Sequence, residues 1–309
     1  MEELNILIND IVDTTIALTI LLLMFTMGLH SKLKEAFLIW RTPRTLLVYL
    51  LSVVVLVPVA AFIVLEVVPD VPVEAKVGAL LLAGAAGNAM VPKLSEKLGQ
   101  DVKVAASILI TLCLVTMISA PLVVQLAIPP ELVTVDGGAV AATILKGVVI
   151  PIFIGVAIRQ WWVKAANVIT DPLTKIADSM LMVVIVLIIV KDIDVILDMG
   201  LITLAVVVGL SATYMAIGHL LGGPTLGGRM QMSMFSGQRN GAVAMLVASS
   251  AVPAAIPVIV AFGIVALVMG IAYMTTVGKG LIPDEPEEDE VGTDEPPAPT
   301  ETTEASATA

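Results

Sequence analysis

Long apolar runs alternate with short polar segments over most of the chain. A run of about 20 residues is what an α-helix needs to cross a bilayer. Nine such runs are predicted, at residues 10–30, 46–68, 73–92, 102–127, 139–161, 175–197, 199–221, 230–250 and 255–278. Their apolar residues are not confined to one helical face, as they would be in a soluble protein. The pattern predicts an all-α polytopic membrane protein with nine transmembrane helices and no second folded domain.

The third and eighth runs differ from the rest because they are rich in glycine and polar residues. Each carries a glycine-flanked asparagine, in "GAAGNAMVP" (84–92) and "SGQRNGAVA" (236–244). An interrupted helix is tolerated at membrane depth where it is buried in protein or lines a cavity. The two runs cross the membrane in opposite directions. We therefore expect an inverted repeat with two broken crossing helices, helices 3 and 8, as in secondary transporters.

Basic residues gather in alternate loops. Twelve of the 16 fall on one side, namely Lys32, Lys34, Arg41, Arg44, Lys93, Lys97, Lys103, Arg159, Lys164, Lys175, Arg229 and Lys279. The other side holds Lys76 and Lys191 among several acids, including Glu131. The positive-inside rule predicts a cell-membrane protein with its N-terminus outside and its C-terminus cytoplasmic. The acidic N-terminus, with Glu2 and Glu3, does not resemble a signal peptide.

Acidic residues concentrate at the C-terminal end. The net charge is −11, and residues 281–309 hold ten of the 27 acids but no Lys or Arg. This Pro/Glu/Thr-rich segment has little to bury, so a disordered acidic cytoplasmic tail is predicted after a transmembrane transporter domain at 1–280. Only 14% of all residues are charged, against about 25% in soluble domains. This low charged fraction predicts that the chain interacts with the lipid bilayer. The oligomeric state stays open.

No pattern of enzymatic chemistry is present in the sequence. It has no glycine-rich phosphate loop, no His/Cys metal cluster and no nucleophile–base arrangement. Cys113 is the single cysteine and cannot form an intrachain disulfide. We therefore expect no enzyme, no cofactor and no nucleic-acid partner.

Arg239 is the most informative polar residue, because an arginine at mid-membrane costs on the order of 2.5 to 3.5 kcal/mol even on insertion scales. It lies too deep for snorkelling. It could pair with a carbonyl near a helix end, stand in for a bound cation, or bind an anionic substrate through its two-pronged guanidinium. Asp13 or Asp178 could be its counter-charge. Asn88, Gln238 and Asn240 could line the same substrate site or could join helices by hydrogen bonds.

Several stretches together resemble the bile acid:sodium symporter family in its nine-helix form. They are "MFTMGL" (24–29), Gly-Asn at 87–88, "VVIPIFIGVAIR" (148–159) and "GQRN" (237–240). The resemblance spans residues 10–278. It implies a panel and a core subdomain, with sodium ions held at the unwound centres of the crossing helices beside the substrate cavity.

The chain departs from that family's pattern at the sodium ligands. Phe235 stands where the family has an acid, Arg239 where it has a glutamine, and Gly87 where serine is common. Hard cations need oxygen ligands, so these changes argue against sodium coupling. The remaining candidates for a sodium site are Asn88, Ser107, Thr111 and Gln238.

These observations predict a secondary transporter that moves a small organic anion by alternating access. Three further functions stay open. They are sodium-coupled symport within the same family, efflux of a metalloid or cation by a related fold, and a non-transporting membrane scaffold.

Overall fold

The computed structural model describes residues 2–88, 90–127, 137–191, 194 and 198–279, and within these ranges every regular element is helical. The elements are α1 (Glu2–Leu29), α2 (Leu33–Ala36), η1 (Leu38–Arg41), α3 (Pro43–Leu50), η2 (Leu51–Leu56), α4 (Val57–Val67), α5 (Val73–Gly84), α6 (Val91–Lys97), α7 (Val102–Ala127), α8 (Gly137–Ile144), η3 (Leu145–Val149), α9 (Ile150–Trp161), α10 (Val163–Lys191), α12 (Gly200–Leu221), α13 (Leu226–Gly237), α14 (Gly241–Ala251), η4 (Pro253–Ala255) and α15 (Ile256–Val277). The acidic segment 281–309, Glu131 and the side chain of Asp13 lie outside the described part.

Five helical stretches of the described chain are long and apolar enough to cross a membrane, judged by length and composition. They are Pro43–Val67, Val102–Ala127, Gly137–Trp161, Gly200–Leu221 and Pro253–Val277. The other predicted crossings correspond to α1, α10 and the interrupted pairs α5–α6 and α13–α14. The all-helical membrane fold is confirmed, whereas the count of nine crossings and the panel and core division stay predictions.

Several helix boundaries differ from the sequence prediction, and α1 already begins at Glu2, eight residues before the predicted start at 10. α10 begins at Val163, twelve residues before the predicted start at 175. Hydropathy marks only the part of a helix that suits hydrocarbon, whereas helical hydrogen bonds are local and continue through polar sequence. The predicted helix 73–92 also ends early, at Gly84, and α6 continues past 92 to Lys97. That break belongs to the site described below.

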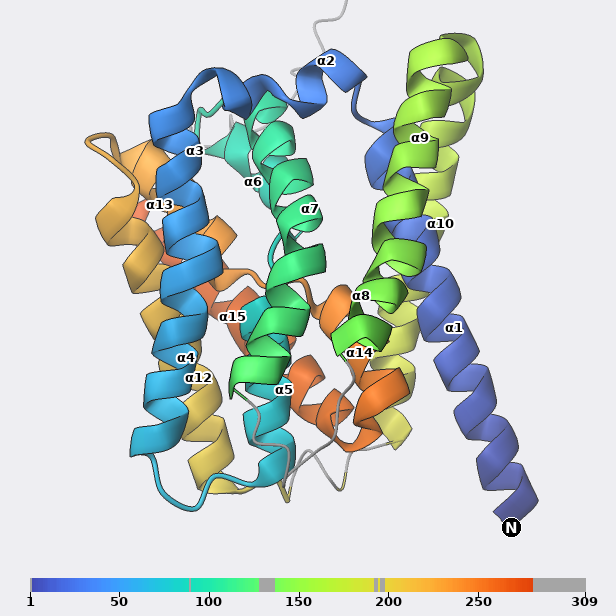
Figure 1. The fold of residues 1–309 in the computed structure, drawn as a ribbon, viewed down its shortest axis with the longest axis vertical. Helices are drawn as coiled ribbons and strands as arrows, with labels where there is room; N and C mark the ends of the chain where they lie inside the picture. The colour runs from blue at the N-terminus through green and yellow to red at the C-terminus, as the bar shows by residue number, and fades with distance from the viewer. Residues whose placement is uncertain (1, 89, 128–136, 192–193, 195–197, 280–309) are drawn as a thin grey trace, which may run out of the picture.

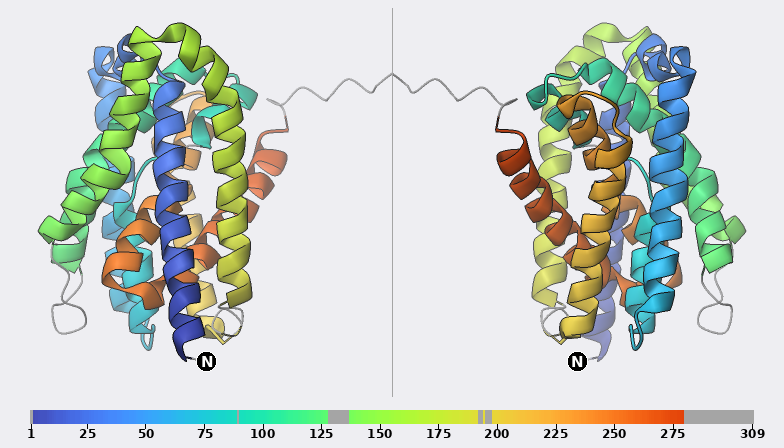
Figure 2. Two further views of the ribbon diagram at one scale, coloured as in Figure 1. Left: turned by 90° about the vertical axis from the view of Figure 1, so that its right-hand side faces the viewer. Right: turned by 90° about the vertical axis from the view of Figure 1, so that its left-hand side faces the viewer.

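α1 packs closely against α9 at two glycines. A Cβ atom at Gly28 would collide with the carbonyl of Ile152, and one at Gly155 with the carbonyl of Phe25. Small residues let membrane helices approach each other in this way. Both glycines belong to stretches that carry the family resemblance. This helix contact is one reason why those stretches contain glycine. α10 packs on the same α1 (Figure 2).

The two ends of the bundle differ in charge. α2, α6 and the turn between α9 and α10 lie at one end, and the N-terminus and the connection from α4 to α5 lie at the other (Figure 1). The first set carries basic residues such as Lys34, Lys97 and Lys164. The fold therefore gathers the basic segments at one end, as the loop pattern predicted. Which side of the membrane that end faces stays a prediction.

Candidate functional site

Two interrupted helices meet at the centre of the molecule. α5 ends at Gly84 and α6 begins at Val91, while α13 ends at Gly237 and α14 begins at Gly241. The main-chain N–H of Asn240 donates to the carbonyl of Ala85 over 3.0 Å. Its side-chain Nδ2 donates to Gly87 over 2.7 Å, and Asn88 Nδ2 donates to the carbonyl of Arg239 over 3.2 Å. The predicted interruptions are confirmed, and each one supplies hydrogen-bond partners to the other.

Arg239 points its guanidinium at the end of α5. Nε donates to the carbonyl of Leu82 at 3.0 Å and Nη2 to that of Ala83 at 2.5 Å. Nη1 donates to the carbonyl of Val53 at 3.2 Å, in the π-helical segment η2. The side chain is 4% exposed. The structure shows the pairing with carbonyls at a helix end, and the other two roles that the sequence allows for this residue stay predictions.

Every main-chain carbonyl from Leu82 to Asn88 accepts a hydrogen bond. Beyond the Arg239 contacts, the donors are Ser119 Oγ to Gly84, Asn240 N to Ala85, Thr116 Oγ1 to Ala86, Asn240 Nδ2 to Gly87 and Val91 N to Asn88. Unpaired carbonyls at this depth would each cost several kcal/mol. The polar residues of the region thus replace the hydrogen bonds that the broken helix gives up.

Gly87 is required by this geometry. Its φ of +87° lies in the left-handed region that favours glycine. An added Cβ would stand 2.9 Å from Cys113 Sγ. The local backbone geometry therefore explains why this chain has glycine where the family often has serine.

The charge of Arg239 is balanced by helix ends. Within the described part of the chain it forms no ion pair, and Asp178, one predicted counter-charge, lies exposed on α10. The C-terminal ends of α5 and α13 both terminate beside it. Each helix C-terminus carries about half a negative charge, so two of them offset one guanidinium. A cation is therefore the complementary group for this position.

Asn88 and Gly241 lie side by side on the more open face of the crossing. Asn88 Nδ2 and Gly241 N both donate to the carbonyl of Arg239. Both residues are half-buried, and a Cβ at Gly241 would meet no atom within 4 Å. Gly241 begins α14, so the positive end of a helix dipole faces this open space. An amide, a helix N-terminus and room beside them suit an anionic group.

The other predicted site residues have different partners. Gln238 Nε2 donates to the carbonyl of Ala266 on α15 at 2.6 Å, and Asn240 Oδ1 caps α14 by accepting from Val243 N. Phe235 is fully buried and packs edge-on against Tyr49, with ring centroids 5.6 Å apart. Of the four predicted substrate residues, only Asn88 is not buried.

Ser107 and Thr111 do not form one site with Asn88 and Gln238, the other two candidates for binding sodium. Ser107 Oγ donates to the carbonyl of Ala36 and accepts from Ile39 N, while Thr111 Oγ1 accepts from Trp40 Nε1 at 3.1 Å. Both hydroxyls bind the segment that follows α1. The hydroxyls of α7 that reach the crossing are Thr116 and Ser119, which the sequence alone did not single out. Their spacing of three residues in an apolar helix was the available signal.

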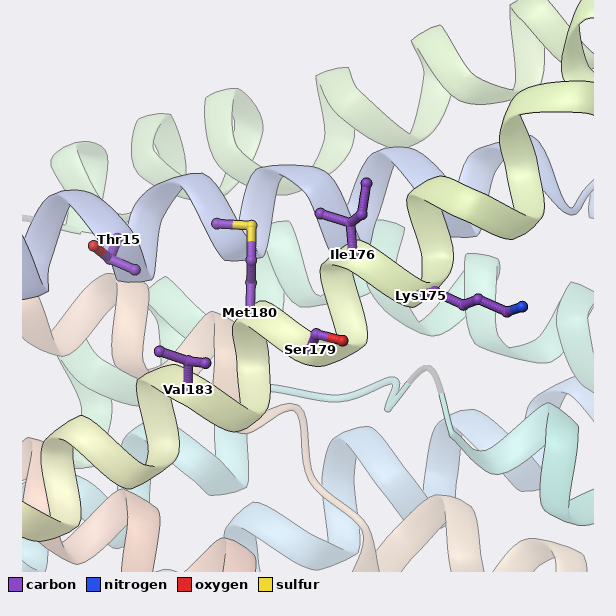
Figure 3. A pocket seen from close by; sticks show the side chains of 6 residues that line it. All are labelled: Thr15, Lys175, Ile176, Ser179, Met180 and Val183. Carbon is purple, nitrogen blue, oxygen red and sulfur yellow. The ribbon is translucent and has the colours of Figure 1, made fainter.

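A separate hollow lies between α1 and α10, with a volume of about 350 Å³ (Figure 3). Its lining is Thr15, Lys175, Ile176, Ser179, Met180 and Val183. None of the predicted site residues lines it. Figure 3 shows that α10 contributes most of the wall.

The fold and the site define a class of membrane transporter whose interrupted helices meet inside a helical bundle. Residues 17–199 match the model of the sodium bile acid symporter family, and the chain belongs to that family. No curated protein sequence matches the chain. The matched region includes the break of α5 but ends before α13, so residues 238–240 lie outside it.

Proposed function

We propose that this protein is a secondary transporter that moves a small organic anion across the cell membrane by alternating access, with its N-terminus outside and its C-terminus cytoplasmic. The family is one of transporters, and an enzymatic function has no support in the sequence. The meeting of two interrupted helices from the two halves of the chain supports alternating access, because transporters of this kind bind substrate at such breaks.

Arg239 takes the place of a bound cation in this proposal. The observation that carries it is the donation by its guanidinium to Leu82, Ala83 and Val53. Those carbonyl oxygens are the hard ligands a sodium ion would need, and N–H groups already occupy them. A fixed positive charge would also repel a second cation. The residues present therefore do not fit sodium here, and no step of the proposed cycle uses it.

The substrate meets Asn88 and the first turn of α14. An anionic group placed beside Gly241 would lie at the positive end of that helix, with the Asn88 amide in reach. Arg239, Gln238 and Asn240 would act behind this surface, by holding the two breaks in position. Asn88 therefore contacts the substrate directly, and the other three residues have a positioning role.

Uptake into proteoliposomes tests the proposal. The substrate would be the carboxylate that gives the largest thermal shift of the purified protein, and sodium would be exchanged for choline at constant ionic strength. Uptake by the unmodified protein is expected to change by less than about twofold. Arg239→Gln is expected to lower uptake at least tenfold without creating sodium dependence. Arg239→Lys should also be impaired, because one ammonium cannot reproduce the planar fork.

Sodium-coupled symport is the second candidate, and the description of the matched family favours it. Strong sodium stimulation of the unmodified protein would establish it and overturn the role given to Arg239. Ion efflux and a scaffold function each have a readout of their own. Thermal shifts with metalloid oxyanions or cations alone would indicate that the protein binds those ions, as an efflux function requires. Deletion of residues 282–309 should leave a transporter working, whereas it should disable a scaffold.

A further inference from the structure

A short segment lies across the basic end of the bundle and joins α1 to α3 (Figure 1). We call this segment, Leu33–Arg41, the strap; it comprises α2, Phe37 and η1. It is too short and too polar to cross the membrane, with Lys34, Glu35 and Arg41 among its nine residues. Its position corresponds to the level where the spanning helices end.

The strap is fixed to α7 by its main chain and by two of its side chains, Glu35 and Trp40. Ser107 Oγ donates to the carbonyl of Ala36 at 3.1 Å and accepts from the N–H of Ile39 at 2.9 Å. Trp40 Nε1 donates to Thr111 Oγ1 at 3.1 Å. Lys103 near the start of α7 pairs with Glu35 at 3.6 Å. These contacts hold one face of the strap on the bundle and leave the other face open.

The open face combines basic and apolar side chains. Lys32, Lys34, Arg41 and Arg44 are exposed at and beside the strap. Leu33 is 45% exposed and Trp40 is 56% exposed, although the indole N–H of Trp40 is bonded. The only acid of the strap, Glu35, is already paired. Basic side chains beside an exposed tryptophan at the end of membrane helices match an anionic lipid surface better than a soluble acidic partner, which would leave the indole in water.

We propose that the strap is a binding surface for the headgroups of anionic phospholipids, with Lys32, Lys34, Arg41 and Arg44 contacting phosphate groups and Trp40 lying at the bilayer interface. Each basic side chain near such a surface is attracted to it independently of transported substrate. Since Ser107 and Thr111 join the strap to α7, lipid bound there also holds one end of the helix whose Thr116 supports the break in α5.

Tryptophan quenching in reconstituted full-length protein tests this proposal without any transport readout. The chain has three tryptophans, so Trp161→Phe with Trp162→Phe leaves Trp40 as the single fluorophore. A small fraction of brominated phosphatidylglycerol or brominated phosphatidylcholine would be added to otherwise neutral vesicles. The anionic lipid is expected to quench Trp40 roughly fivefold more effectively per molecule, the enrichment that about 1 kcal/mol gives.

Matched charge variants decide whether the basic residues at the strap cause the preference for the anionic lipid. Changing Lys32, Lys34, Arg41 and Arg44 together to Gln should remove the preference for the anionic lipid. Changing Lys97, Lys164, Lys175 and Lys279 to Gln removes the same charge from exposed positions outside the strap and should leave the preference in place. Equal quenching by the two lipids in the parent protein would overturn the proposal, as would an equal loss in both variants. A preference that appears only after deletion of 281–309 would assign the strap to the acidic segment instead and would also overturn it.

Discussion

Gly241 is the residue at which substrate binding and helix stability can be separated. It is the first residue of α14, it has open space around its Cα, and its φ is not in the left-handed region. We expect Gly241→Asp to keep or raise thermal stability, because an acid in the first turn gains about 0.3–1 kcal/mol from the helix dipole. The same carboxylate should repel an anionic substrate and lower uptake at least tenfold.

Gly241→Asn is the matched control, since it has the same shape without the charge. Its uptake should stay within about threefold of the unmodified protein. Uptake and thermal unfolding in detergent would be measured on both variants. If the two variants transport equally well, the anion does not bind at the start of α14.

At the level of elements, α7 holds the break of α5 through Thr116. The Thr116 hydroxyl accepts from Ala86 N at 3.0 Å and can donate to Ala86 O at 3.1 Å. Thr116→Val keeps the shape but leaves these buried main-chain groups unpaired, which costs about 1–3 kcal/mol. We expect a clear fall in the thermal unfolding temperature together with reduced uptake.

Thr213→Val on α12 controls for the change of residue type. The Thr213 hydroxyl is exposed and bonds only to Gly209 O within its own helix. Its loss should leave the unfolding temperature unchanged within about a degree, because no second element depends on it. Equal effects of the two substitutions would show that Thr116 does not hold the break.

At the scale of the whole molecule, the two ends of the bundle predict its orientation. In a Cys113→Ala background, a cysteine at Glu74 should react with a membrane-impermeant maleimide from outside intact cells. A cysteine at Lys97 or Lys164 should react only after permeabilisation, because the positive-inside rule predicts that the basic end faces the cytoplasm. All three positions are exposed in the structure, so accessibility to water is not the limiting factor. The reverse labelling pattern would invert the topology.

The sequence determined those features that depend on local composition and on distance along the chain. Apolar length fixed the membrane class and most helix positions, because each helix satisfies its own main chain. Glycine next to asparagine in "AGNAM" and "QRNGA" located both interruptions. The cost of a charge at membrane depth singled out Arg239 before its contacts were known.

Tertiary structure decided which group each polar side chain meets. The acceptors of Arg239 are carbonyls of residues 53, 82 and 83, and carbonyls are common to all residues, so sequence cannot mark them. For the same reason Ser107 and Thr111 resembled Thr116 and Ser119 in sequence, yet the first pair binds the strap and the second pair binds the break. The two pairs lie at different positions on the surface of α7. Which segment each pair meets is set only by how α7 packs against α5 and the strap.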